Sequence, residues 1–246
     1  MDQVQKLLPT FDDKAEALHY WQSKLEQGLP ELQLPCDFSQ PSPDRGGTTF
    51  RSVVPREIKE NLKKLAKAQQ ASLFMVLFSA FNLLLSRLTG QEEILCRVPA
   101  AGRDQPELHP VIGYFVNSIM VKNQVKNGEN FVDLLHRVVE NTLDAFQYQW
   151  YPFEQVVEDL HREMPVTKVS FNMLSMRESE AGTDLEELEA FSSEDITEAK
   201  FPLIIRLTEY RNGIEIGWDG QKALFKPSSL ERMARQYIEL LKTISH

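Results

Sequence analysis

The sequence has few cysteines, no basic N-terminal segment and no apolar run long enough to cross a membrane. Its two cysteines, Cys36 and Cys96, are far apart and do not form a CxxC pair. This scarcity argues against a disulfide framework and favours a reduced, cytoplasmic setting. The longest apolar block, residues 73–85, is too short for a transmembrane helix, and the N-terminus does not resemble a signal peptide. We therefore expect a protein that does not associate with membranes.

Signatures of a self-contained catalyst are also missing. There are five histidines, none adjacent to another, and none has metal-ligand spacing such as HExxH. The sequence lacks a GxSxG elbow, a Walker loop and a GxGxxG turn. We predict no catalytic residue and no metal site in this chain. The histidines are His19, His109, His136, His161 and His246.

The composition is that of an acidic globular protein. The 246 residues carry a formal net charge of −9, and 42% of them are hydrophobic. This length suits one large domain or two small ones with a substantial core. An acidic chain lacks the concentrated basic surface that phosphate binding requires, so we expect no nucleic-acid partner.

Periodicity predicts alternating helices and strands. Helices are expected over residues 12–27, 55–69, 72–88, 129–146, 153–160 and from 227 onward, with Ser72 capping the third. Strands are expected at residues 50–54, 94–98, 168–176, 201–210 and 214–218. Asn212-Gly213 is a strong hairpin signal, and the acidic stretch 177–200 is typical of a long loop. The pattern predicts an α/β (α+β) fold in which helices cover a mixed β-sheet.

Four lysines in the second predicted helix lie largely off its apolar face. Such a cluster can form a binding patch, but a solvent-exposed helix face is the more common explanation. The lysines are Lys59, Lys63, Lys64 and Lys67.

Three segments together resemble a known family. They read Pro99-Ala100-Ala101-Gly102-Arg103, Ile112-Gly113-Tyr114-Phe115-Val116-Asn117-Ser118 and Gln149-Trp150-Tyr151-Pro152-Phe153-Glu154. In this order and spacing they resemble the C-terminal signature motifs of condensation domains from nonribosomal peptide synthetases. Residues 20–25, 34–37, 72–77 and 88–94 extend the resemblance over nearly the whole chain. It implies a chloramphenicol-acetyltransferase-like fold.

The missing histidine pair indicates how much of such a domain is present. Condensation domains carry an HHxxxDG motif in their N-terminal half, and this chain has no adjacent histidines. The resemblance therefore implies that residues 1–246 are the C-terminal, acceptor-side lobe. Residues 1–46 would form a crossover helix and linker, and residues 177–225 would include a latch that bridges to the other lobe. The isolated lobe is expected to be inactive.

The segment 112–118 combines a glycine, two aromatic rings and an amide. Gly113 beside Tyr114 and Phe115 indicates either a close backbone approach by a packed ring or a tight start to a strand. Asn117 lies in an apolar run and must be hydrogen-bonded if it is buried. By resemblance, its role in holding the fold is favoured over contact with substrate.

Arg103 follows a glycine at the end of a predicted strand. The resemblance implies that it reaches across the lobe interface to the aspartate of HHxxxDG, a task that suits the planar guanidinium. The alternative is an ordinary surface arginine. Together with Asn117, Arg103 is assigned to support of the active site between the lobes.

The segment around residue 150 departs from the family pattern. The family usually has His or Asn, then Gln and Asp, where this chain has Tyr148, Gln149 and Trp150. The following Pro152-Phe153-Glu154 is explained by structure alone, since proline sets the turn, the ring packs and the carboxylate favours a helix N-terminus. The channel-lining residues implied by the resemblance are Gly113, Tyr114, Tyr148 and Gln149.

The resemblance implies amide-bond formation between a donor acyl or peptidyl thioester and an acceptor aminoacyl thioester. Both substrates would arrive on phosphopantetheine arms of peptidyl carrier proteins, so no cofactor would bind directly. The implied partners are the N-terminal lobe, the carrier proteins and an adjacent adenylation domain. Two alternatives stay open: a non-catalytic lobe that docks carrier proteins, and a stand-alone acyltransferase acting on coenzyme A, which would need an HxxxD-type base.

Overall fold

The fold is taken from a computed structural model that describes most of the chain. The described residues are 11–26, 28–38, 46–102, 111–113, 115–161, 163, 167–174, 191–196 and 198–245, with only the backbone described for 11–13, 25 and 191–196. Two residues predicted to belong to the site, Arg103 and Tyr114, lie outside these ranges. So do His109, His246 and most of the acidic stretch after β4.

A mixed sheet of seven strands forms the framework of the described residues. Its order is β3-β2-β4-β6-β7-β1-β5. β2 runs parallel to β4, and β4 runs parallel to β6, whereas all other neighbouring strands are antiparallel. The strands are β1 (Gly47–Pro55), β2 (Glu93–Ala100), β3 (Asn117–Gln124), β4 (Val169–Leu174), β5 (Phe191–Ile196), β6 (Leu203–Tyr210) and β7 (Gly213–Gln221).

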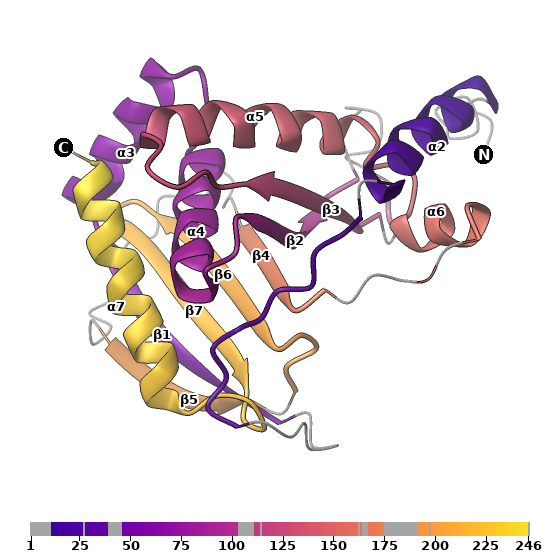
Figure 1. The fold of residues 1–246 in the computed structure, drawn as a ribbon. Coiled ribbons are helices and arrows are strands. Elements are labelled where there is room, and N and C mark those ends of the chain that lie inside the picture. Colours follow the sequence, from indigo (N-terminus) through magenta and orange to yellow (C-terminus); the bar gives the residue numbers. More distant parts are fainter. Residues whose placement is uncertain are drawn as a thin grey trace.

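Helices pack around the sheet, and α4 lies at the centre of them (Figure 1). α4 contacts α3, α5, α7 and β2. In Figure 1, α2 and α6 lie together beside β3, at the end of the sheet away from α7. The helices are α2 (Phe11–Glu26), α3 (Arg56–Ala68), α4 (Leu73–Thr89), α5 (Phe131–Gln147), α6 (Phe153–Asp159) and α7 (Pro227–Ile244).

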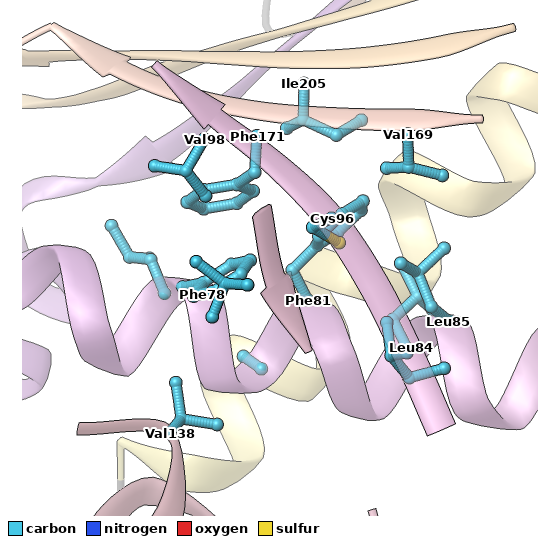
Figure 2. Packing of buried hydrophobic residues seen from close by; sticks show 14 of the residues in the cluster. Phe78, Phe81, Leu84, Leu85, Cys96, Val98, Val138, Val169, Phe171 and Ile205 are labelled. Carbon is cyan, nitrogen blue, oxygen red and sulfur yellow. The ribbon is translucent and has the colours of Figure 1, made fainter. Parts of the chain in front are cut away.

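Aromatic rings fill the space between α4 and the sheet. The ring centroid of Phe171 in β4 lies 5.0 Å from that of Phe78 and 5.2 Å from that of Phe81, both in α4. Figure 2 shows these side chains with Cys96 and Val98 of β2 between the helix and the sheet. All five are fully or almost fully buried. Because α4 is apolar nearly all round, it is stable only when neighbours cover it on several sides.

Local signals explain where α4 begins and ends. The Ser72 hydroxyl accepts a hydrogen bond from the amide of Met75 at 3.2 Å, as predicted for a helix cap. At the other end, Gly90 adopts a left-handed conformation with φ of 72°, which glycine tolerates without a Cβ penalty. The core helix is therefore bounded by its own sequence.

Three asparagines form a polar chain through the core. Asn123 in β3 donates to Asn82 in α4 at 3.3 Å and accepts from Asn141 in α5 at 3.1 Å. Asn82 in turn donates to the carbonyl of Phe78 at 2.7 Å. Buried amides require such partners, so this chain restricts how α4, β3 and α5 can pack.

Every predicted helix and strand is present, with boundaries shifted by a few residues. The predicted hairpin is confirmed, although its two turn residues are Arg211 and Asn212 and Gly213 already belongs to β7. Two strands were missed. β3 starts at Asn117 in a stretch with no clear alternation, and β5 lies in the acidic segment predicted to be a loop. Both are edge strands of the described sheet, where burial imposes the weakest pattern.

The expectation of a solvent-exposed lysine face is wrong for one of the four lysines. Lys59 is buried, and its ammonium donates to the carbonyls of Tyr210 and Arg211 at 2.7 and 2.8 Å. It therefore holds the β6–β7 turn against α3. Lys63, Lys64 and Lys67 are exposed, as expected.

No single helix within the described ranges is long and apolar enough to cross a membrane; α3 and α4 have the required length and apolar character only together, and the chain bends by 102° between them.

Replacing Lys59 by alanine should lower the free energy of unfolding by about 1–3 kcal/mol, because two partly buried carbonyls lose a charged donor. Lys64→Ala is the matched control. Lys64 is exposed on the same helix, so its loss should change stability by less than about 0.5 kcal/mol. Urea unfolding followed by circular dichroism measures both variants, and equal stability losses would contradict the assigned role of Lys59.

Candidate active-site edge

Three sequence segments converge at one edge of the sheet. β2 and β4 are parallel, so their C-terminal ends lie at the same edge. β3 begins there, because Ala100 at the end of β2 pairs with Asn117 at the start of β3. We call the described residues 99–102, 111–113, 115–118 and 148–154 the site edge.

Gly102 lets the first segment pack tightly on the second, and Gly113 makes room for a ring within the second segment. Gly102 has φ of +63°, and a Cβ placed on it would lie 2.1 Å from the carbonyl oxygen of Phe115. A Cβ on Gly113 would lie 2.9 Å from Cε2 of the Phe115 ring. Of the two interpretations left open for Gly113, the structure shows the close approach of a packed ring, and Gly102 is a second position that sequence reasoning did not assign.

A hydrogen bond from Asn117 joins the second segment to the third. Its Nδ2 donates to the carbonyl of Gln149 at 2.7 Å, and its Oδ1 accepts from the amide of Ser118 at 2.8 Å. The side chain is half-buried with both polar ends satisfied. These bonds agree with the structural role that the resemblance favours for Asn117.

Tyr148 is held by α2. Its ring stacks on that of Tyr20, with centroids 4.6 Å apart and planes inclined by 29°. Its hydroxyl donates to the Glu16 carboxylate at 2.9 Å. Burial raises the pKa of Tyr148, and the hydrogen bond to Glu16 raises it further by a smaller amount. The hydroxyl therefore stays protonated and remains a donor at neutral pH.

The segment 150–154 packs as its structural explanation predicts. Trp150 stacks on Tyr151 with centroids 5.4 Å apart. The Phe153 ring is buried against the Trp21 ring of α2, 5.2 Å away in an edge-on arrangement. Glu154 in the first turn of α6 accepts from Arg97 of β2 at 3.2 Å. This segment therefore docks α6 and α2 against the end of the sheet.

A charged group at the end of α6 also holds α2. The Lys14 ammonium lies 2.9 Å from a carboxylate oxygen of Asp159, and the Tyr151 hydroxyl donates to the same oxygen. Two hydrogen bonds lower the pKa of Asp159 from 3.8 to about 2, with the larger effect from Tyr151 and the smaller from Lys14. The ionised form of Asp159 is therefore the one that fits the fold.

The sheet face next to the site edge is polar. Arg206 of β6 forms a two-point bond with Asp219 of β7, at 2.5 and 2.8 Å, and Thr49 of β1 donates to the same carboxylate at 2.6 Å. A second diagonal pair joins Arg51 to Glu215 at 2.6 Å. Positive and negative groups balance here, and because Thr49 and Asp219 are buried, the two arginines are the more accessible members of these pairs.

Apolar side chains are exposed around the site edge. Ile112 is 100% exposed, Val116 is 47% exposed, and Leu174 at the end of β4 is 54% exposed. Large apolar side chains gathered at one place on a surface indicate an interaction site.

The described site edge lacks a proton acceptor suited to catalysis at neutral pH. The three histidines within the described ranges, His19, His136 and His161, are exposed and lie outside it. Its one carboxylate, Glu154, is engaged by Arg97. The described residues also contain no group of three or more His, Cys, Asp and Glu arranged to hold a metal ion. Within the described ranges the site edge therefore presents aromatic rings and hydrogen-bonding groups but no group suited to act as a base at neutral pH.

Comparison with known proteins reveals extensive similarity along the sequence. A family model described as Condensation domain matches residues 8–246. Tyrocidine synthase 3 from Brevibacillus parabrevis is 33% identical over 239 residues, covering 95% of this chain and 4% of that protein. Surfactin synthase subunit 1 from Bacillus subtilis (strain 168) is 34% identical over 228 residues, covering 91% of this chain and 6% of that protein. The chain thus spans only a small part of these relatives.

Solved structures share the fold. A four-domain nonribosomal peptide synthetase bound to AMP and glycine matches with a TM-score of 0.82 and 19% identity, covering 96% of this chain and 20% of that one. The X-domain from teicoplanin biosynthesis matches with a TM-score of 0.77 and 22% identity, covering 94% of this chain and 54% of that one. The predicted fold class, a mixed α/β sheet of chloramphenicol-acetyltransferase-like type, is confirmed.

The structure brings together four of the residues predicted for the site. Gly113, Asn117, Tyr148 and Gln149 all lie at the site edge. Their predicted roles toward substrate and the partner lobe stay predictions. Gly102 could have been recognised from its place at a strand end, but the partnership of Tyr148 with α2 has no signal in the sequence.

Replacing Gly102 by alanine should destabilise the protein more than replacing Gly128 by alanine. Both have positive φ, but a Cβ on Gly128 meets no atom within 4 Å, so that variant carries only backbone strain of about 1–2 kcal/mol. Gly102→Ala adds a clash with Phe115, for a total of about 2–5 kcal/mol. Chemical denaturation of both variants checks this, and equal losses would show that the segments do not pack as described.

Acid should weaken the attachment of α2 over a defined pH range. The pKa of Asp159 in the folded protein, about 2, is below its ordinary 3.8. The ionised carboxylate therefore adds stability above about pH 4, and this contribution is lost as the pH falls toward about 2. Unfolding free energies of the wild type and Asp159→Asn should converge over this range. A constant difference between them down to pH 2 would contradict the assignment.

Proposed function

Because this chain belongs to the condensation-domain family, we propose that residues 1–246 form the C-terminal, acceptor-side lobe of a condensation domain in nonribosomal peptide synthesis. The observation that carries this proposal is the site edge itself. It gathers the family's motif residues and exposes apolar side chains, but its described part holds no base suited to the reaction. A second lobe that covers the edge and supplies an HHxxxDG histidine would complete the site.

The proposed reaction transfers an acyl group from sulfur to nitrogen. The amine of the acceptor aminoacyl thioester attacks the carbonyl carbon of the donor thioester, so a C–N bond forms as the C–S bond breaks. The amine loses a proton to a base, and the departing thiolate takes one up to leave as a thiol. Both thioesters arrive on phosphopantetheine arms of carrier proteins, which makes the arms part of the substrates. Holding two such substrates in line accounts for much of the expected acceleration.

The residues of this chain would position the acceptor. In the proposal Gly113, Tyr114, Tyr148 and Gln149 line the channel, and Asn117 keeps two of its walls together. Arg103 would reach the aspartate of HHxxxDG in the other lobe. The bond of Asn117 to the carbonyl of Gln149 supports this arrangement, since it fixes the third segment beside the second.

Two observations support a partner lobe at this edge. Ile112, Val116 and Leu174 are large apolar side chains that a docking surface would bury. The chain also covers 54% of the X-domain structure, as expected for one lobe of two. Beyond that lobe, the proposed partners are carrier proteins and an adjacent adenylation domain, in a cytoplasmic setting that suits the two free cysteines. The region predicted to include the latch, residues 177–225, contains β6 and β7, and both are interior strands of the sheet. We therefore propose that the part that bridges to the other lobe precedes Leu203.

The isolated chain should form no amide, and adding the matching N-terminal lobe in trans should restore amide formation. The assay supplies donor and acceptor aminoacyl carrier proteins and measures the dipeptidyl product by mass spectrometry. An N-terminal lobe whose histidine pair is changed to alanine is the negative control. Activity of this chain alone would refute the proposal. Absence of activity with the intact partner, while carrier proteins still bind, would favour the non-catalytic docking lobe.

Leu174→Glu should reduce product formation in the complemented enzyme by about tenfold or more, because it places a charge in the proposed lobe interface. Leu143→Glu is the matched control, since Leu143 on α5 is 56% exposed and Leu174 is 54% exposed. Both variants should fold normally. Equal effects of the two substitutions would show that the partner does not dock at the site edge.

A further inference from the structure

Helix α2 is attached to the site edge through aromatic rings. Tyr20 stacks on Tyr148 with centroids 4.6 Å apart, and Trp21 packs edge-on against Phe153 at 5.2 Å. Glu16 accepts from the Tyr148 hydroxyl at 2.9 Å. We call these three contacts the α2 clamp.

The segment that the α2 clamp holds is positioned by side-chain contacts and turn bonds rather than by strand pairing. Between α5 and α6 it is shaped by short turn bonds, including Gln149 to the carbonyl of Phe146 at 3.1 Å and Tyr151 to the carbonyl of Tyr148 at 3.1 Å. It pairs with no strand. A segment of this kind takes its position largely from side-chain contacts, and losing these lowers the free energy of local opening.

The clamped segment in turn contacts the start of β3. The Gln149 carbonyl, one residue after Tyr148, accepts from Asn117 Nδ2 at 2.7 Å. The Oδ1 atom of the Asn117 side chain accepts a hydrogen bond from the backbone N–H of Ser118 at 2.8 Å. A continuous set of contacts thus runs from α2 through Tyr148 and Gln149 to Asn117.

We infer that α2 positions the site edge, with Tyr148 as a positioning residue that transmits the placement of α2 to Asn117. A shift or loosening of α2 would move the Gln149 carbonyl and with it the start of β3. Coupling between α2 and Asn117 requires an unbroken series of contacts. The structure contains each contact of that series, from Tyr20 to Tyr148 and from Gln149 to Asn117. The coupling itself does not depend on the proposed function. Its consequence does: if the site edge lines the acceptor channel, α2 sets the geometry of that channel.

The chemistry at position 148 suits this role. The family usually has His or Asn there, whereas a tyrosine offers both a ring for Tyr20 and a hydroxyl for Glu16. Burial raises the pKa of Tyr20 and of Tyr148, so both phenols stay neutral at physiological pH. The stack therefore carries no charge of its own that would repel the nearby Asp144 carboxylate.

The test is residue-resolved amide hydrogen exchange by NMR on the chain as it stands. Tyr20→Leu should speed exchange of the amides at residues 116–119 and 149–151 by about two- to tenfold, as expected from the loss of the ring contacts that Tyr20 makes with Tyr148 and Trp21. Tyr210→Leu makes the same chemical change at a half-buried tyrosine of the β6–β7 hairpin. It should leave both reporter groups within about twofold of the wild type once global stability is matched with denaturant.

A second substitution tests the route. Asn117→Asp keeps the oxygen that accepts from Ser118 but removes the Nδ2 donor to Gln149. In this background Tyr20→Leu should still speed exchange at 149–151 but should no longer do so at 116–119. An unchanged effect at 116–119 would overturn the inference, as would no effect of Tyr20→Leu at 149–151 in the wild-type background.

A milder variant guards against misfolding of Tyr20→Leu. Tyr148→Phe keeps the ring and removes only the hydroxyl bond to Glu16, so it should speed exchange at both groups in the same direction but by a smaller factor. No change at either group would count against the α2 clamp. None of these measurements uses a partner lobe or a carrier protein, so a failure of the amide-forming assay and a failure of this coupling are separate results.

Discussion

The burial of α4 is the constraint on which the rest of the structure depends. A helix that is apolar nearly all round cannot lie on a surface, so α3, α5, α7 and the sheet must surround it. The aromatic packing of Phe78 and Phe81 on Phe171 places α4 against β4. The buried asparagine chain then ties the same helix to β3 and α5. With these contacts made, the ends of β2 and β4 and the start of β3 have little freedom.

The site edge follows from that placement. Parallel strands end at a common edge, and chain segments that leave such an edge are well placed to form a site. Here the absence of side chains at Gly102 and Gly113 lets the backbone and ring of Phe115 pack closely. Asn117 adds a side-chain bond that connects this packing to the segment before α6. The edge is therefore held by backbone pairing where it borders the sheet and by side-chain contacts, including those of α2, where it does not.

This division suits a lobe that works with a partner. The exposed Ile112, Val116 and Leu174 are apolar side chains that a docked partner would bury. In the proposed enzyme the other lobe covers them, and α2 holds the acceptor side of the channel in register. Positioning and proton handling would then belong to different pieces of the protein.

The helices, the five strands with clear patterns, the hairpin, the Ser72 cap and the motif residues of the site edge can all be predicted from the amino-acid order alone. These features come from periodicity, turn chemistry and motif order, all of which act over short stretches of chain. Three further features emerge only in the folded chain: β3 and β5 are strands, Lys59 is buried, and Tyr148 stacks on Tyr20. Each of these depends on a partner far away in the chain, such as the turn carbonyls that receive Lys59, and local pattern carries no information about such partners.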